Sequence, residues 1–102
     1  MMSLKKQFNA KKHLCKVTFT LAENIADSSN RVNLVGDFNN WDIESIPMER
    51  LKDGDYSVSI NLEKGKEYQF KYLVEGLGWL NEKEADKHVV NVFQTENSVV
   101  IV

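Results

Sequence analysis

The sequence has one cysteine, Cys15, so an internal disulfide is excluded, and it has no Asn-x-Ser/Thr glycosylation site. No apolar run approaches the roughly 20 residues that a membrane helix needs. Residues 1–8 lack the apolar stretch that is typical of a secretory signal. These absences predict a cytoplasmic location, in a reducing compartment, and no membrane partner.

An excess of positive charge is also missing. The chain of 102 residues has 13 Lys and Arg against 15 Asp and Glu, a net charge of −2, so we expect no nucleic-acid partner. The lysines nevertheless gather at the start, where five of them precede Glu23, the first acidic residue. We expect residues 1–11 to form a basic, partly flexible arm and residues 12–102 a single domain. Such an arm can contact an anionic partner, but a solvated arm is favoured because Phe8 is its one aromatic residue.

Helical periodicity is weak throughout, whereas the alternation of apolar and polar residues that is typical of strands recurs along the chain. Strand-like runs cover residues 13–21, 31–35, 55–62, 68–74, 89–93 and 99–102. Turns are predicted at Asp53-Gly54, at 63–66 and at 76–78. Six or seven short strands joined by turns indicate an all-β fold, an antiparallel β-sandwich or a small barrel, with no helix longer than about two turns.

Signals for catalysis and metal binding are weak. His13 and Cys15 share a strand face but lack further ligands, and His88 has no recognisable nucleophile, so we expect no metal and no cofactor. Asp37 and Asp42 flank one loop and form the only carboxylate pair that merits comparison with a glycosidase. Carboxylates in such loops more often bond their own backbone, and we therefore expect no enzyme.

Two tryptophans stand apart from the other aromatic residues, most of which fall on apolar strand faces. Trp41 lies in a loop of Asn and Asp, and Trp79 directly follows a Gly-x-Gly turn. An indole at the surface is an apolar plate with a polar N–H at its edge, which suits the apolar face of a glucose ring. A lid over the open end of the core is the alternative, and the spacing alone leaves both interpretations open.

The run VNLVGDFNNW, residues 32–41, resembles the V-x-L-V-G-D-F-N-x-W opening of carbohydrate-binding module family 48. That family includes isoamylase early-set domains, amino-terminal modules of branching enzymes and the glycogen-binding domain of the AMP-activated protein kinase β subunit. The resemblance extends from about Cys15 to Val102 and is closest to short bacterial stand-alone proteins with a lysine-rich start. Its further motifs are Pro47-Met48, residues 54–58, residues 68–76, Trp79 and residues 95–100.

The resemblance implies an immunoglobulin-like early-set β-sandwich. Glycogen-binding members of the family stack glucose on two tryptophans, and Trp41 and Trp79 fall at the matching positions. A lysine in the Y-x-F-K strand bonds sugar hydroxyls in those members, and Lys71 matches it. Alternation also turns Lys71 away from the apolar face of its own strand.

The closing segment of the family carries a bulky apolar residue, a threonine and an asparagine, each two positions apart. Phe93, Thr95 and Asn97 occupy those places, so the resemblance implies that they contact the sugar. The sequence departs from the P-N-P-F-G of the stand-alone relatives at residues 90–94, which read VNVFQ.

Two functions remain open at this point. The first is a non-catalytic carbohydrate-binding module that recognises α-1,4-glucans such as glycogen and starch by aromatic stacking. The second is a protein-interaction or regulatory module of the same fold that docks on a glycogen-metabolising enzyme, with Trp41 and Trp79 as its anchors. The presence of Lys71 beside both tryptophans favours the first.

Overall fold

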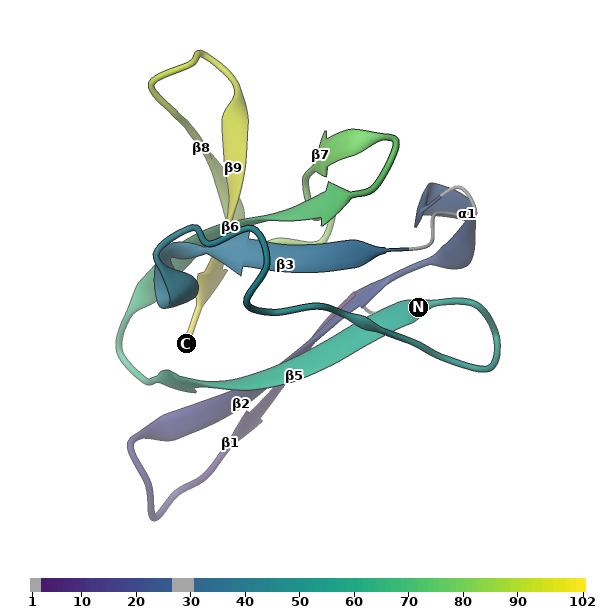
Figure 1. Ribbon diagram of the computed structural model, residues 1–102. Coiled ribbons are helices and arrows are strands. Elements are labelled where there is room, and N and C mark those ends of the chain that lie inside the picture. Colours follow the sequence, from purple (N-terminus) through teal and green to yellow (C-terminus); the bar gives the residue numbers. More distant parts are fainter. Residues whose placement is uncertain (1–2, 27–30) are drawn as a thin grey trace.

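The computed structural model describes residues 3–26 and 31–102, which form two antiparallel sheets packed face to face (Figure 1). The sheet that we call the β5 sheet has the order β1-β2-β5-β4, with β1 at Leu4–Phe8, β2 at Leu14–Leu21, β5 at Tyr56–Glu63 and β4 at Glu49–Arg50. The β6 sheet has the order β3-β6-β9-β8, with β3 at Val32–Gly36, β6 at Glu67–Val74, β9 at Glu96–Ile101 and β8 at Lys87–Val90. Strand β7, Gly78–Leu80, also pairs with β6. The predicted all-β antiparallel sandwich is confirmed, consistent with an immunoglobulin-like early-set fold.

Alternation along each strand builds the core. Cys15 and Phe19 of β2 face inward and are fully buried. Phe70 of β6 meets Phe19 edge to face across the sandwich, with the ring centroids 5.0 Å apart. Because Phe70 and Tyr72 point into this core, the odd-numbered residues between and beside them project from the outer face of the β6 sheet.

The predicted turns are found, and the strands differ from the predicted runs at several places: β4 was not predicted, and β9 begins at Glu96, before the predicted residue 99. Strand β1 lies within the lysine-rich segment and pairs with β2, so that Leu4 is buried opposite Phe19. The charged residues of β1 do not show the apolar–polar alternation by which a strand is predicted from sequence. Lys6 of this strand forms an ion pair with Asp86, with 2.7 Å between the charged atoms. The prediction of a strand through residue 93 is wrong, because β8 ends at Val90 and the chain then turns.

Helices play a minor part in this fold. Those among the described residues are α1, Glu23–Ala26, and the 3-10 helix η1, Asp37–Asn39. The expectation of no helix beyond about two turns is therefore confirmed for the part of the chain that the structure describes. Within the same residues no helix has the length and apolar character needed to cross a membrane.

A buried polar pair closes the core near β7. The Tyr72 hydroxyl donates a hydrogen bond of 2.6 Å to Oε1 of Glu82, whose other carboxylate oxygen accepts from the backbone N–H of Glu84 at 2.9 Å. Burial raises the pKa of Tyr72 well above its ordinary value of 10.0, and the neighbouring Glu82 carboxylate raises it further.

This raised pKa predicts a loss of stability in alkali. Above pH 10 the unfolded chain releases the Tyr72 proton while the folded protein keeps it, so the free energy of unfolding falls as pH rises, by at most about 1.4 kcal/mol per pH unit from this group. Urea unfolding between about pH 8 and pH 11 measures the effect, because this range includes the ordinary tyrosine pKa of about 10. The Tyr72→Phe variant should lose stability less steeply over that range. Equal slopes for both proteins would contradict the assignment.

Candidate functional site

The loop that carries Trp41 begins where β3 ends. Asn40 and Trp41 both adopt positive φ angles, 56° and 58°, a conformation that costs an ordinary residue about 1–2 kcal/mol. The backbone N–H of Trp41 donates to the carbonyl of Gly36 at 2.9 Å, and the Asn39 side chain accepts from the Gly36 N–H at 3.0 Å. The amide of Asn39 also donates to the carbonyl of Asp42 at 3.0 Å. These bonds hold Trp41 in its unusual conformation.

Asp37 sets the orientation of the Trp41 ring. One of its carboxylate oxygens accepts from Nε1 of Trp41 at 3.0 Å, and the other accepts from the backbone N–H of Gln69 at 2.8 Å. Asp42 accepts from the backbone N–H of Glu44 at 2.9 Å. Both carboxylates thus shape the loop, as expected from the sequence. The sequence analysis did not identify Asp37 as the partner of the indole, although its place four residues before Trp41 was the available signal.

Lys71 and Trp79 lie on the outer face of the β6 sheet. Lys71 is paired with Val35 of β3, and Trp79 is paired with Leu73, the next outward residue along β6. Trp79 follows the turn at Gly76 and is 47% exposed, far more open than a lid over the core. The Trp41 ring is partly exposed, as is Lys71.

The register gives the spacing of the positions on β6 to which the two tryptophans are linked. Trp41 is bonded to Gly36, which pairs with Phe70, whereas Trp79 pairs with Leu73. Three residues of strand separate these positions, about 10 Å along β6 at roughly 3.3 Å per residue. Lys71 lies between these two positions, on the same face as Trp79.

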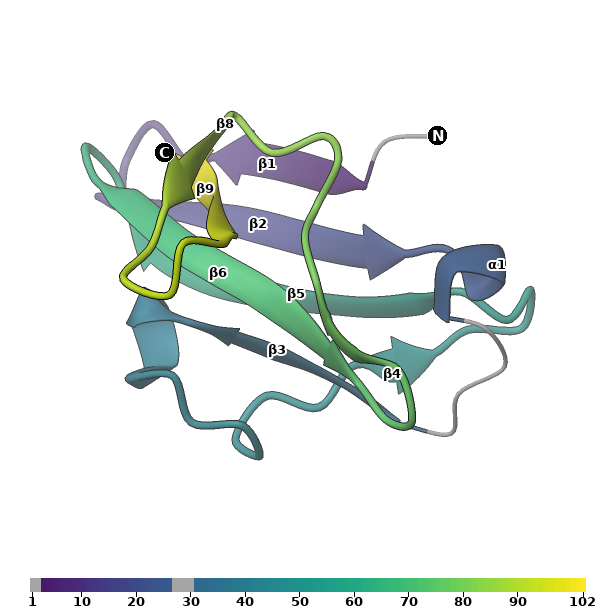
Figure 2. The same ribbon diagram turned by 90° about the horizontal axis from the view of Figure 1, so that it is seen from above.

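The β8–β9 hairpin borders this face. Figure 1 shows that the hairpin and β7 both rise on the side of β6 that faces away from β5. Seen from above in Figure 2, the tip of the hairpin lies at the same end of the sandwich as η1, where the Trp41 loop begins. Phe93 and Thr95 are both exposed in this tip, Phe93 to 82%. Asn97 lies in β9 and is buried, with 8% of its surface exposed.

We call the surface that these elements form the glucan face, after the ligand that the resemblance implies. The sequence predicts six residues for it: Trp41, Lys71, Trp79, Phe93, Thr95 and Asn97. The register places Lys71 and Trp79 on one face of β6, and Asn97 is bonded to Gln69 of that strand. Segments far apart in the sequence contribute to the glucan face. Chemically the face offers exposed aromatic surface beside an ammonium group, which suits a neutral ring with apolar faces and polar edges.

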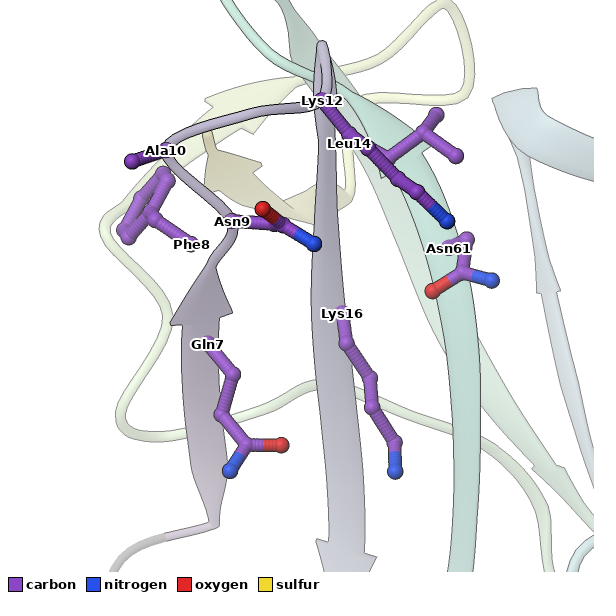
Figure 3. A pocket seen from close by; sticks show the side chains of 8 residues that line it. All are labelled: Gln7, Phe8, Asn9, Ala10, Lys12, Leu14, Lys16 and Asn61. Carbon is purple, nitrogen blue, oxygen red and sulfur yellow. The ribbon is translucent and has the colours of Figure 1, made fainter.

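A second surface lies on the opposite sheet. A hollow of about 460 Å³ lies at the turn between β1 and β2. Figure 3 shows Gln7 and Lys16 side by side along their strands there. Phe8 also lines the hollow, but its ring points away from these two side chains. Across residues 3–26 and 31–102, no group of three or more His, Cys, Asp and Glu is placed to hold a metal.

Comparisons with known proteins agree with this geometry. A family model described as carbohydrate-binding module 48 (isoamylase N-terminal domain) matches residues 13–91, which include Trp41, Lys71 and Trp79. Over 47 residues the chain is 40% identical to the 1,4-alpha-glucan branching enzyme GlgB of Photobacterium profundum. That alignment covers 45% of this chain and 7% of the enzyme, so the chain corresponds to a small part of that relative.

Proposed function

The chain belongs to the carbohydrate-binding module 48 family, and on this premise we propose that it is a non-catalytic module that binds α-1,4-linked glucans such as glycogen. The observation that carries the proposal is the shared face of Lys71 and Trp79, with the Trp41 loop at its far end. The positions on β6 that are linked to the two tryptophans, Phe70 and Leu73, lie about 10 Å apart, a spacing that suits a curved chain with successive apolar ring faces.

The proposed mechanism is stacking, with hydrogen bonds at the ring edges. Trp79 offers a plate that is already exposed, and Trp41 offers one whose N–H is bonded to Asp37 and therefore fixed in direction. Lys71 supplies up to three N–H donors to sugar hydroxyls. Because these groups are in place before the ligand arrives, little ordering is needed on binding.

No catalysis is proposed for this face. Glycoside hydrolysis requires an acid and a second carboxylate across the scissile bond. Asp37 and Asp42, the pair that the sequence offered, are bonded to Trp41, Gln69 and Glu44. Docking on a glycogen-metabolising enzyme is a separate proposal, which glucan binding neither requires nor excludes.

Electrophoresis in native gels with and without glycogen tests the proposed function. We expect glycogen to retard the protein strongly, and Lys71→Ala to reduce this retardation by about threefold to tenfold, because a hydrogen bond from a charged donor is worth about 1.5 kcal/mol or less at a partly wet surface. Lys71 projects from the outer face, so its removal should change the free energy of unfolding by less than about 0.5 kcal/mol.

Lys16→Ala, on the outer face of the β5 sheet, is the matched control and should be retarded like the parent protein. Unchanged retardation of the Lys71→Ala protein, or an equal loss in both variants, would show that Lys71 is not part of the site.

A further inference from the structure

In the tip of the β8–β9 hairpin, residues 91–95, the Asn91 side chain makes four hydrogen bonds. The Asn91 oxygen accepts from the backbone N–H groups of Phe93 and Thr95, at 2.9 and 3.2 Å. The Asn91 amide nitrogen donates to Oγ1 of Thr95 at 2.7 Å and to Oδ1 of Asn97 at 3.0 Å. An asparagine side chain has two donor hydrogens and two acceptor lone pairs, and all four are used here.

Apolar packing does not explain the shape of the tip. Val92 and Phe93 are 89% and 82% exposed, and Val90 beside them is 72% exposed. Gln94 adopts a positive φ of 63°, which a glutamine seldom adopts without support. Two backbone hydrogen bonds, from the Asn91 N–H to the Thr95 carbonyl at 2.8 Å and from the Gln94 N–H to the Asn91 carbonyl at 3.0 Å, close the turn. The side-chain hydrogen bonds of Asn91 add four more interactions that fix it.

These bonds also connect the tip to the sheet. Asn97, which is buried, donates from its amide to the side-chain oxygen of Gln69 at 3.0 Å. The backbone N–H of Gln69 in turn donates to Asp37, the residue that orients Trp41. A continuous series of hydrogen bonds thus runs from Asn91 to the loop at the other side of β6.

We propose that Asn91 is a positioning residue for ligand binding: it holds Phe93 and Thr95 in place at the border of the glucan face. Its own side chain is fully engaged within the protein, so it acts through these two residues and through Asn97. The proposal rests on the proposed glucan-binding function. Without Asn91 the exposed tip must be ordered each time the ligand binds, and that ordering weakens the affinity.

Calorimetric titration with β-cyclodextrin, a cyclic α-1,4-glucan, tests the proposal in three variants. Asn91→Ala removes all four bonds, and we expect the affinity to fall about fivefold to tenfold. Asn91→Asp keeps the acceptors for the two backbone N–H groups and should recover at least half of that loss on a logarithmic scale. Val92→Ala changes the most exposed side chain of the tip and should stay within about twofold of the parent.

Amide hydrogen exchange supplies a second readout that is independent of the ligand. In Asn91→Ala the N–H groups of Phe93 and Thr95 should exchange at least tenfold faster, whereas those of β6 should not change, because the tip lies outside the core. In Asn91→Asp both N–H groups should stay protected.

The two proposals fail in different ways. If the parent protein does not bind β-cyclodextrin or glycogen, the proposed function is wrong. If the parent binds and Asn91→Ala binds equally well, or if its tip exchanges no faster, Asn91 is not a positioning residue. An Asn91→Asp protein with a protected tip but the weak affinity of Asn91→Ala also overturns the proposal.

Discussion

Replacing Trp79 by alanine should lower the affinity for β-cyclodextrin by at least tenfold and change the free energy of unfolding by about 1 kcal/mol or less. Stacking of a flat ring on an aromatic side chain is worth about 1–3 kcal/mol, by analogy with measured base–aromatic stacking, and 1.4 kcal/mol is a factor of ten. The stability changes little because the indole is already 47% exposed. Titration and urea unfolding of the same variant measure both quantities.

Leu77→Ala is the matched control for this variant. Leu77 lies in the turn before β7 and is 49% exposed, so its removal also takes apolar surface from this region. Its affinity should stay within about twofold of the parent. The opposite pattern, a loss of about 3–5 kcal/mol of stability in Trp79→Ala with the affinity of its folded fraction retained, would identify Trp79 as part of the core.

The largest effect on stability is expected at Gly36, the last residue of β3 before the Trp41 loop. A Cβ atom at this position would lie 2.5 Å from the carbonyl oxygen of Gln69 and 2.8 Å from Cβ of Phe70. The φ angle of Gly36, −175°, is ordinary extended backbone, so the cost of Gly36→Ala is steric. We expect the free energy of unfolding to fall by about 3 kcal/mol, at the upper end for overpacking, because backbone atoms must move.

Comparison with Gly76→Ala distinguishes a steric loss of stability from a loss that is caused by an unfavourable backbone conformation. Gly76 has a φ of 81° and nothing within 4 Å of an added Cβ, so this variant should lose only the 1–2 kcal/mol or so that a left-handed conformation costs. Urea unfolding of both variants gives the comparison. An equal or smaller loss in Gly36→Ala would mean that β3 and β6 can separate at this point without penalty.

Gly36→Ala should also weaken glucan binding in the fraction that stays folded. The carbonyl of Gly36 accepts the N–H of Trp41, and its own N–H is bonded to Asn39. A displacement of this residue therefore moves the loop that orients the indole.

The sequence was sufficient for the elements in which local pattern and fold agree. Alternation identified β2, β5 and β6 and the inward side of each, because one face of these strands is buried and the other is not. The same reasoning placed Lys71 outside the core. Asp53-Gly54 predicted the turn before β5, where Gly54 has a φ of 95°.

The sequence was insufficient where long-range contacts decide the structure. Strand β1 has one apolar residue buried, Leu4, and is otherwise charged or polar up to Phe8, so pairing with β2 is needed to define it. The end of β8 depends on Asn91, whose side chain competes with the sheet for the N–H groups of the following residues. Apolar residues at 92 and 93 suggested a continued strand.

The contact between Asp37 and Gln69 also could not be predicted from the sequence. They are 32 residues apart and meet only because β3 and β6 are neighbours. Their contact orients Trp41. The sequence predicts that Trp41 lies in a loop, but it does not predict the direction of its ring. Motif resemblance predicted the residues of the glucan face, and the sheet register shows why Lys71 and Trp79 share one side of β6.

The most direct test of the glucan face is calorimetric titration of the parent protein with β-cyclodextrin and, in parallel, with a soluble cello-oligosaccharide of similar mass. Both ligands are chains of glucose with the same hydroxyl groups, and they differ in the curvature that the linkage imposes. The account predicts saturable binding of β-cyclodextrin and at least tenfold weaker binding of the straight β-linked chain. Equal affinity for the two ligands, or no binding of β-cyclodextrin by the folded protein, would contradict it.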